Sequence, residues 1–230
     1  MRAAWALVLA SLASDALALP MLQDGAGWQV VGLPKQTLPM TRFGFAQQDG
    51  QHVLRVEASG SYGNLVHELA DGSPPGRWLQ WRWKLDTPLA AADLRSKAGD
   101  DAALKVCALF DLPLEALGLV ERAKMRMARA VSGQWLPAAT LCYVWDPSLP
   151  AGTLLPNAHS PRLRWIVARG SGAPLQAWQS ERRDLHADFL RAFADEAQTV
   201  PPLKAIAVGA DADNTGGRSV GWVAALDLQP

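Results

Sequence analysis

The sequence has no net charge, few cysteines and few tyrosines. Its 230 residues include 22 Lys plus Arg against 22 Asp plus Glu, with 2 Cys and 2 Tyr. A chain with no net positive charge does not attract the phosphate backbone of nucleic acids, so nucleic acid is not an expected partner. Two isolated cysteines and four scattered histidines argue against a zinc site.

Apolar residues, by contrast, are abundant. They make up 49% of the chain and include 10 Trp, which is enough to build a hydrophobic core and excludes a disordered chain. No segment after residue 18 is an uncharged apolar run of 18 residues, so the sequence predicts no transmembrane segment in the mature chain.

The N-terminus has the pattern of a secretory signal peptide. Arg2 precedes an apolar run over residues 3–13, and the small-x-small sequence at 16–18 fits a cleavage site before Leu19. The run is shorter than the roughly 20 residues of a membrane-spanning helix. We therefore expect residues 1–18 to be removed and residues 19–230 to form one periplasmic or secreted domain.

Period-two alternation predicts most of the secondary structure. In the segment 79–86 every odd position is apolar and every even position is polar, which is typical of a half-buried β-strand. Residues 103–110 are also typical of a strand, with Leu104, Val106, Ala108 and Phe110 on one face. Shorter runs predict further strands at 28–33, 53–58, 141–145, 163–167, 203–208 and 220–228.

Two segments have a helical pattern instead. Leu185, Phe189 and Phe193 are four residues apart and follow Asp184, a suitable N-cap, so we expect a short helix near residues 184–197. Residues 114–131 have a helical composition with four clustered cations, which suit a solvated helix face or an anionic partner. Strands separated by turns predict a mainly β protein, a jelly-roll-like antiparallel β-sandwich with one or two short helices.

The two cysteines leave two alternatives open. Cys107 and Cys142 both lie in strand-like runs. If these strands are neighbours, an oxidising compartment permits a disulfide. The alternative is two buried free thiols that act as small hydrophobic residues.

An ordered set of short motifs resembles a known bacterial family. The set consists of 81–84, 97–103, 143–146, 181–184, 188–189 and 211–216. In this order they resemble the exported family called domain of unknown function 3047, over nearly the whole mature chain. The resemblance implies an envelope protein of Gram-negative bacteria and brings no assigned reaction. It also implies other residue types in place of Cys107 and Cys142, so two departures to Cys favour the disulfide.

The segment 211–216 resembles the first half of a calcium-binding loop. Oxygen-bearing side chains stand at loop positions 1, 3 and 5, with glycine at position 6, but Trp222 replaces the bidentate glutamate at position 12. Calcium would need further carboxylates, and Asp100 and Asp101 are the expected donors. The alternative is a loop held by Asx-turns. The candidate metal ligands are Asp211, Asp213, Asn214 and Thr215.

Aromatic and ionisable residues supply candidates for ligand binding. Paired aromatic faces on strands can stack on sugar rings, although the alternation of Trp81 and Trp83 predicts that these two fill the core. Acid/base chemistry on an acidic sugar would use residues of the types found here, without diagnostic spacing. The candidate ligand-binding residues are Lys97, Asp100, Asp101, Tyr143, Trp145 and Arg183, with His159 as a further acid/base candidate.

Three functions therefore remain open. The leading one is non-catalytic binding of an envelope or extracellular glycan, with a possible structural calcium ion. The second is a carbohydrate-active enzyme on the same scaffold, a glycoside hydrolase or polysaccharide lyase. The third is an envelope assembly or interaction protein. A β-sandwich hosts all of these functions, so the fold class does not choose among them.

Overall fold

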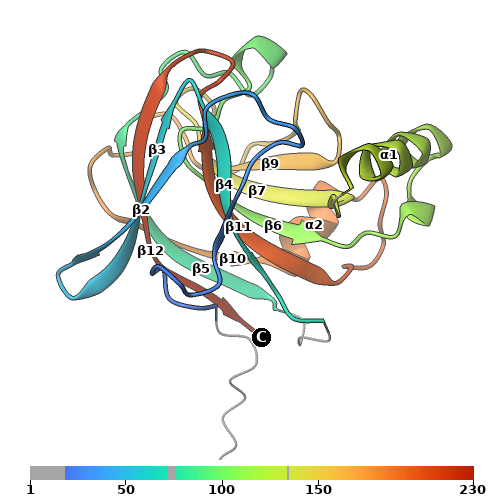
Figure 1. Ribbon diagram of the computed structural model, residues 1–230, viewed down its shortest axis with the longest axis horizontal. Coiled ribbons are helices and arrows are strands. Elements are labelled where there is room, and N and C mark those ends of the chain that lie inside the picture. The colour runs from blue at the N-terminus through green and yellow to red at the C-terminus, as the bar shows by residue number, and fades with distance from the viewer. Residues whose placement is uncertain (1–18, 72–75, 134) are drawn as a thin grey trace, which may run out of the picture.

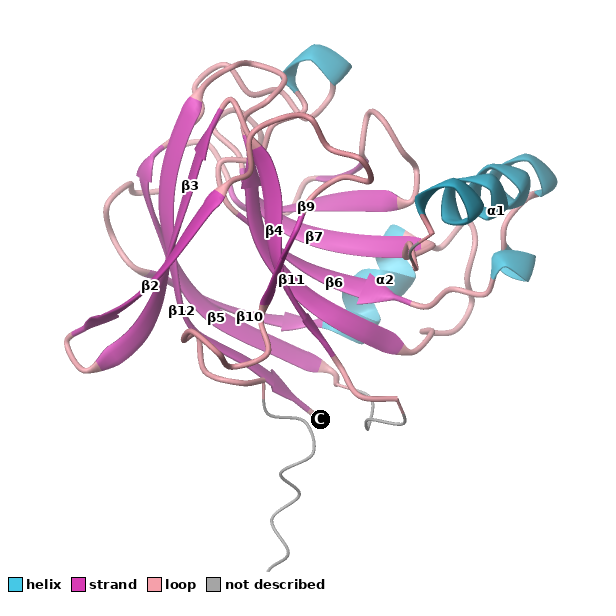
Figure 2. Cartoon of the chain, in the orientation of Figure 1, coloured by secondary structure: helices cyan, strands magenta, loops and turns pink. Residues whose placement is uncertain are grey.

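The computed structural model describes residues 19–71, 76–133 and 135–230; the expected signal peptide at 1–18 lies outside these ranges. Two β-sheets pack face to face and two α-helices lie at the periphery (Figure 1). Figure 2 shows that strands dominate the chain. The mainly β sandwich predicted from the sequence is confirmed. None of the helices in the described ranges is long and apolar enough to cross a membrane.

One sheet has seven strands and the other has five. The larger sheet has the order β1 (Gln29–Val31), β4 (Tyr62–Glu68), β11 (Leu203–Asp211), β6 (Lys105–Phe110), β7 (Ala139–Trp145), β9 (Leu163–Arg169) and β8 (Leu154–Pro156). The smaller sheet has the order β10 (Gln179–Asp184), β5 (Trp78–Thr87), β12 (Arg218–Gln229), β3 (Gln51–Ser59) and β2 (Arg42–Gln48).

Among the described strands the pairing is antiparallel, as expected, with one exception. Strands β7 and β9 run parallel. The chain leaves β7, forms the short edge strand β8, and then turns back so that β9 lies between them. Because β9 is antiparallel to β8, it runs in the same direction as β7.

Aromatic side chains join the two sheets in the core. The ring of Trp83 on β5 lies 5.5 Å from that of Trp145 on β7, and the ring of Trp81 lies 5.3 Å from that of Tyr143. All four side chains are buried. The expectation that Trp81 and Trp83 fill the core is confirmed, because alternate residues of β5 face the other sheet.

Both helical segments of the sequence form helices. Helix α2 (Leu185–Ala192) begins at Asp184, whose carboxylate accepts hydrogen bonds from the amides of His186 and Ala187. Leu185 and Phe189 are buried, so this expectation is confirmed. In the other segment, the 3₁₀ turn η2 (Leu114–Ala116) precedes helix α1 (Leu119–Ser132). A second 3₁₀ turn, η1 (Lys97–Gly99), lies between β5 and β6.

A buried carboxylate links three strands of the smaller sheet. Glu57 on β3 accepts hydrogen bonds from Arg42 on β2, from Arg55 on its own strand and from Arg218 on β12. The hydrogen bonds from Arg55 and Arg218 are the main reason that the pKa of Glu57 falls from 4.5 to about 2. This charge cluster therefore stabilises the fold when Glu57 is ionised.

Replacing Glu57 should weaken the fold and change its acid sensitivity. We expect Glu57→Gln to lower the free energy of unfolding at pH 7 by about 2 kcal/mol, because hydrogen bonds to a charged group are lost. In the unmodified protein this contribution should be present above pH 4.5 and disappear as the pH falls toward about 2. Urea unfolding at several pH values measures both effects. Glu115→Gln, at an exposed site, is the control and should change little.

Candidate ligand groove

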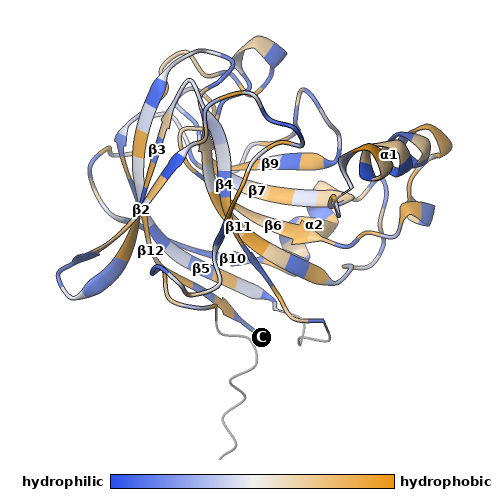
Figure 3. Ribbon diagram, viewed as in Figure 1, coloured by the Kyte–Doolittle hydropathy of each residue, from blue (hydrophilic) through white to orange (hydrophobic). Residues whose placement is uncertain are grey.

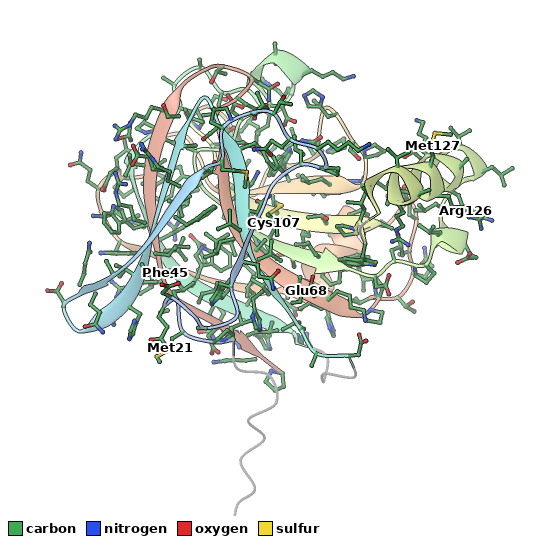
Figure 4. All side chains as sticks on the ribbon, viewed as in Figure 1. Met21, Phe45, Glu68, Cys107, Arg126 and Met127 are labelled. Atoms are coloured by element: carbon green, nitrogen blue, oxygen red, sulfur yellow. A yellow bond between two sulfur atoms is a disulfide. The ribbon has the colours of Figure 1, made fainter. Side chains whose placement is uncertain are left out.

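A groove of about 240 Å³ crosses the outer face of the seven-stranded sheet. This face points away from the core, because the side chains of each strand alternate between the two faces. The floor is apolar and consists of Cys107, Cys142, Ala205 and Ala207. Figure 4 labels Cys107 in the middle of the sheet and Glu68 farther along it.

A disulfide forms the centre of the floor. Cys107 on β6 and Cys142 on β7 are direct partners in the strand register, and their sulfur atoms are bonded. Their Cα atoms are 4.0 Å apart. The bond ties together two central strands beneath the groove.

Strand β4 supplies one wall of the groove and most of its polar groups. Tyr62, Asn64, Val66 and Glu68 follow one another at period two and all line the groove. The side-chain amide of Asn64 donates a hydrogen bond to the hydroxyl of Tyr62, with a distance of 3.2 Å. The strands predicted from the sequence do not include β4. Its alternation is detectable, but glycines at 60 and 63 interrupt the apolar pattern.

Two chain segments form the rims. One rim contains residues 31–34, and the other contains residues 135–137, which follow helix α1. Trp135 is 42% exposed. A neighbouring hollow of about 330 Å³ shares Glu68 and Trp135 with the groove and also contacts Asp111 and Lys204. The two hollows therefore form one elongated depression along β4.

A buried ion pair closes the opposite end of the groove. The ammonium group of Lys105, a side chain only 3% exposed, lies 2.9 Å from a carboxylate oxygen of Asp211 and 4.9 Å from the ring centre of Tyr62. Burial disfavours the charged ammonium, but the charge and hydrogen bond of Asp211, together with Tyr62 and Asp100, outweigh it, so the pKa of Lys105 is raised. Lys105 is thus a fixed positive charge where Tyr62 and the floor meet.

The predicted calcium residues lie beside this ion pair. Asp101 accepts hydrogen bonds from the amides of Asn214 and Thr215 and from the hydroxyl of Thr215. Asp211 accepts hydrogen bonds from the amide of Ala102 and from Lys105. Lys105 is therefore the cation that neutralises Asp211 in this cluster.

Two further carboxyl groups in this cluster are less well neutralised. Burial is the main reason that the pKa values of Asp100 and Asp213 are raised, and repulsion by Asp211 adds to the effect in both. One oxygen of Asp100 accepts a hydrogen bond from Asn157, while the other is buried without a hydrogen-bond partner among the described residues. Among the residues that the structure describes, no group of three or more His, Cys, Asp or Glu side chains is arranged to hold a metal ion.

The structure divides the predicted ligand-binding residues among different places. Tyr143 donates a hydrogen bond to Asp188 on α2, and Arg183 also binds Asp188. Trp145 is buried in the core. Lys97 is exposed on η1, and its carbonyl oxygen lies 3.3 Å from a ring nitrogen of His159. None of these residues lines the groove.

A family model matches most of this chain. The model of a family described as a protein of unknown function, DUF3047, matches residues 26–227. The chain belongs to this family. The match covers nearly the whole chain and confirms the family resemblance inferred from the motifs. A search of curated proteins finds no match.

The solved structures that match this chain do so at low sequence identity and with low TM-scores. A mutant of a family 29 carbohydrate-binding module is 11% identical, with a TM-score of 0.36, and the alignment covers 92% of this chain and 89% of the module. A structure entitled "CBM4 structure and function" is 10% identical, with a TM-score of 0.35 and coverage of 95% and 100%. The enzymatically active domain of bacteriophage CBA120 tailspike protein 4 is 10% identical, with a TM-score of 0.37 and coverage of 92% and 21%.

Removing Lys105 should test the ion pair at the end of the groove. We expect Lys105→Met to lower the free energy of unfolding by about 3–5 kcal/mol, because Asp211 becomes an unpaired buried charge. The double variant with Asp211→Asn should regain part of this loss. Urea unfolding measures both, and equal stability of the single and double variants would contradict the pairing.

Calcium binding at this cluster stays a prediction. The variant Lys105→Met makes the test of calcium binding more sensitive. Millimolar calcium should raise the melting temperature, and the rise should be larger in Lys105→Met, where the ion replaces the lost ammonium. Chelator should reverse the rise, and Asp213→Ala should abolish it. A melting temperature that ignores calcium in both proteins would end the calcium hypothesis.

Proposed function

We propose that the protein binds a glycan, without catalysis, in the groove on the outer face of the seven-stranded sheet. The observation that carries this proposal is the composition of the groove. Two aromatic side chains, Tyr62 and Trp135, stand near its two ends, and an apolar floor lies between them. Sugar rings suit such a groove, because each ring has apolar faces that stack on aromatic side chains and hydroxyl groups around its edge.

The polar residues of the groove suit hydroxyl recognition. Asn64 has both donor and acceptor atoms, Thr140 has a hydroxyl group, and Glu68 is an acceptor. All three come from strands, so the sheet holds them in place before a ligand arrives. Such preorganisation lowers the entropic cost of binding. The elongated depression along β4 favours a chain of several sugar units over a single sugar.

Binding is favoured over hydrolysis by the distribution of carboxylates. Glycoside hydrolases use two carboxyl groups about 5–10 Å apart on either side of the scissile bond. Among the described residues that line the groove itself, Glu68 is the sole carboxylate; Asp71 and Asp111 line the neighbouring hollow, and Asp211 is paired with Lys105. Release of reducing sugar from a bound glycan, abolished by Glu68→Gln, would favour the carbohydrate-active enzyme instead.

We also propose that the protein acts outside the cytoplasm, in the periplasm or beyond it. The signal-like residues 1–18 support export. A bonded cysteine pair suits an oxidising compartment. Leu19 and Leu22 pack in the hydrophobic core, so cleavage before Leu19 leaves both in the mature protein.

Variants of the groove test glycan binding. A glycan array with the mature protein should identify a ligand, and calorimetry should then show at least a tenfold loss of affinity in Trp135→Ala, since stacking on an exposed ring is lost. Asn64→Ala should also weaken binding. Trp178→Ala, just before β10 of the smaller sheet and outside the groove, is the control and should bind normally. Normal affinity in both groove variants would refute this site.

Export is tested separately. Expression with the full N-terminus in a Gram-negative host should yield a periplasmic protein that begins at Leu19, because the small residues at 16 and 18 fit the signal peptidase. Mass spectrometry of the periplasmic fraction measures the N-terminus. Recovery of intact Met1 from the cytoplasm would contradict the proposal.

A further inference from the structure

Helix α1 has an unusual orientation. It projects from the end of the seven-stranded sheet (Figure 1), and Met125 is its one fully buried residue among those described. Figure 3 shows apolar colouring on the part of α1 that points away from the sheets. A surface helix ordinarily turns its apolar stripe toward the core, whereas α1 presents much of it to solvent.

The exposed side chains form one continuous stripe. At about 100° per residue, Leu119, Val120, Met127 and Val131 fall within an arc of roughly 120° together with two alanines. Their exposures are 80%, 68%, 70% and 63%. Four large apolar side chains so exposed on one helix face are more than scattered surface hydrophobics, and such patches mark interaction sites.

Polar contacts on the opposite face hold α1 in this orientation. The guanidinium group of Arg122 donates hydrogen bonds to the carbonyl oxygens of Glu115 and Leu117. Arg129 donates two hydrogen bonds to the carbonyl oxygen of Leu136. Because these arginines bind the protein's own backbone, the helix cannot roll its apolar stripe inward without losing them.

Cations flank the apolar stripe on both sides. Lys124 borders one edge and Arg126 the other, and their side chains are 68% and 63% exposed. In Figure 4, Met127 and Arg126 extend away from the sheets. Lys124 pairs with Glu121, and Arg126 lies 3.8 Å from Glu115. The segment 114–132 has four cationic residues against two acidic ones, so its charge is positive.

We propose that α1 docks on the surface of an anionic phospholipid bilayer. Its apolar stripe would enter the boundary between headgroups and acyl chains, and Lys124 and Arg126 would contact lipid phosphates. Charge complementarity favours this occupant over a second copy of the chain, because two-fold packing would bring the cationic edges together.

Vesicle binding tests this proposal. The mature protein should co-sediment with vesicles of phosphatidylcholine and phosphatidylglycerol, and far less with phosphatidylcholine alone. Val120→Asp with Met127→Asp should reduce binding at least tenfold. Both positions are solvent-exposed, so the fold should be retained, as circular dichroism would verify. Leu190→Asp, at an exposed apolar residue of α2, is the matched control and should bind like the unmodified protein.

A second pair of variants examines the charges. Lys124→Ala with Arg126→Ala should weaken binding to anionic vesicles and reduce its dependence on salt. Equal binding to neutral and anionic vesicles, or unchanged binding by the double aspartate variant, would overturn the proposal. Analytical ultracentrifugation adds one further outcome: a dimer that the double aspartate variant abolishes would identify a second copy as the occupant and also overturn it.

Discussion

The aromatic contact between the two sheets determines which side chains of the central strands face the core and which face outward. Trp81 and Trp83 on β5 meet Tyr143 and Trp145 on β7 in the core. Since alternate residues of a strand point to opposite faces, burial of these rings turns their neighbours outward. Cys142 lies between Tyr143 and the core residue Leu141, and so must face the other side of the sheet, where it meets Cys107.

The outer face of the larger sheet is consequently a second, partly covered surface. At one end, Leu94, Ala102 and Leu149 from the connecting loops pack against Trp165 and its neighbours and make a small second core. The rest of the face is the groove. The Lys105–Asp211 pair lies between these regions, where a charge is removed from water but has a partner. On the outer face of the larger sheet, connecting loops therefore cover one part, and the uncovered part is the proposed ligand site.

The groove and helix α1 are physically connected. The chain passes from α1 to Trp135, Leu136 and Pro137, which form one rim of the groove. Arg129 of α1 binds the carbonyl oxygen of Leu136 and so fixes this rim to the helix. A ligand in the groove and a lipid surface at α1 would thus contact adjoining segments of the chain.

Local patterns in the sequence were sufficient for much of this description. Alternation located most strands, and the spacing of Leu185, Phe189 and Phe193 after Asp184 located α2, because these features depend only on near neighbours. The tertiary structure alone revealed that Lys105, inside an apolar strand, pairs with Asp211, which is 106 residues away. It also placed β4 along the groove. Finally, periodicity shows that a helix has an apolar stripe, but long-range packing decides whether that stripe faces the core or, as in α1, the solvent.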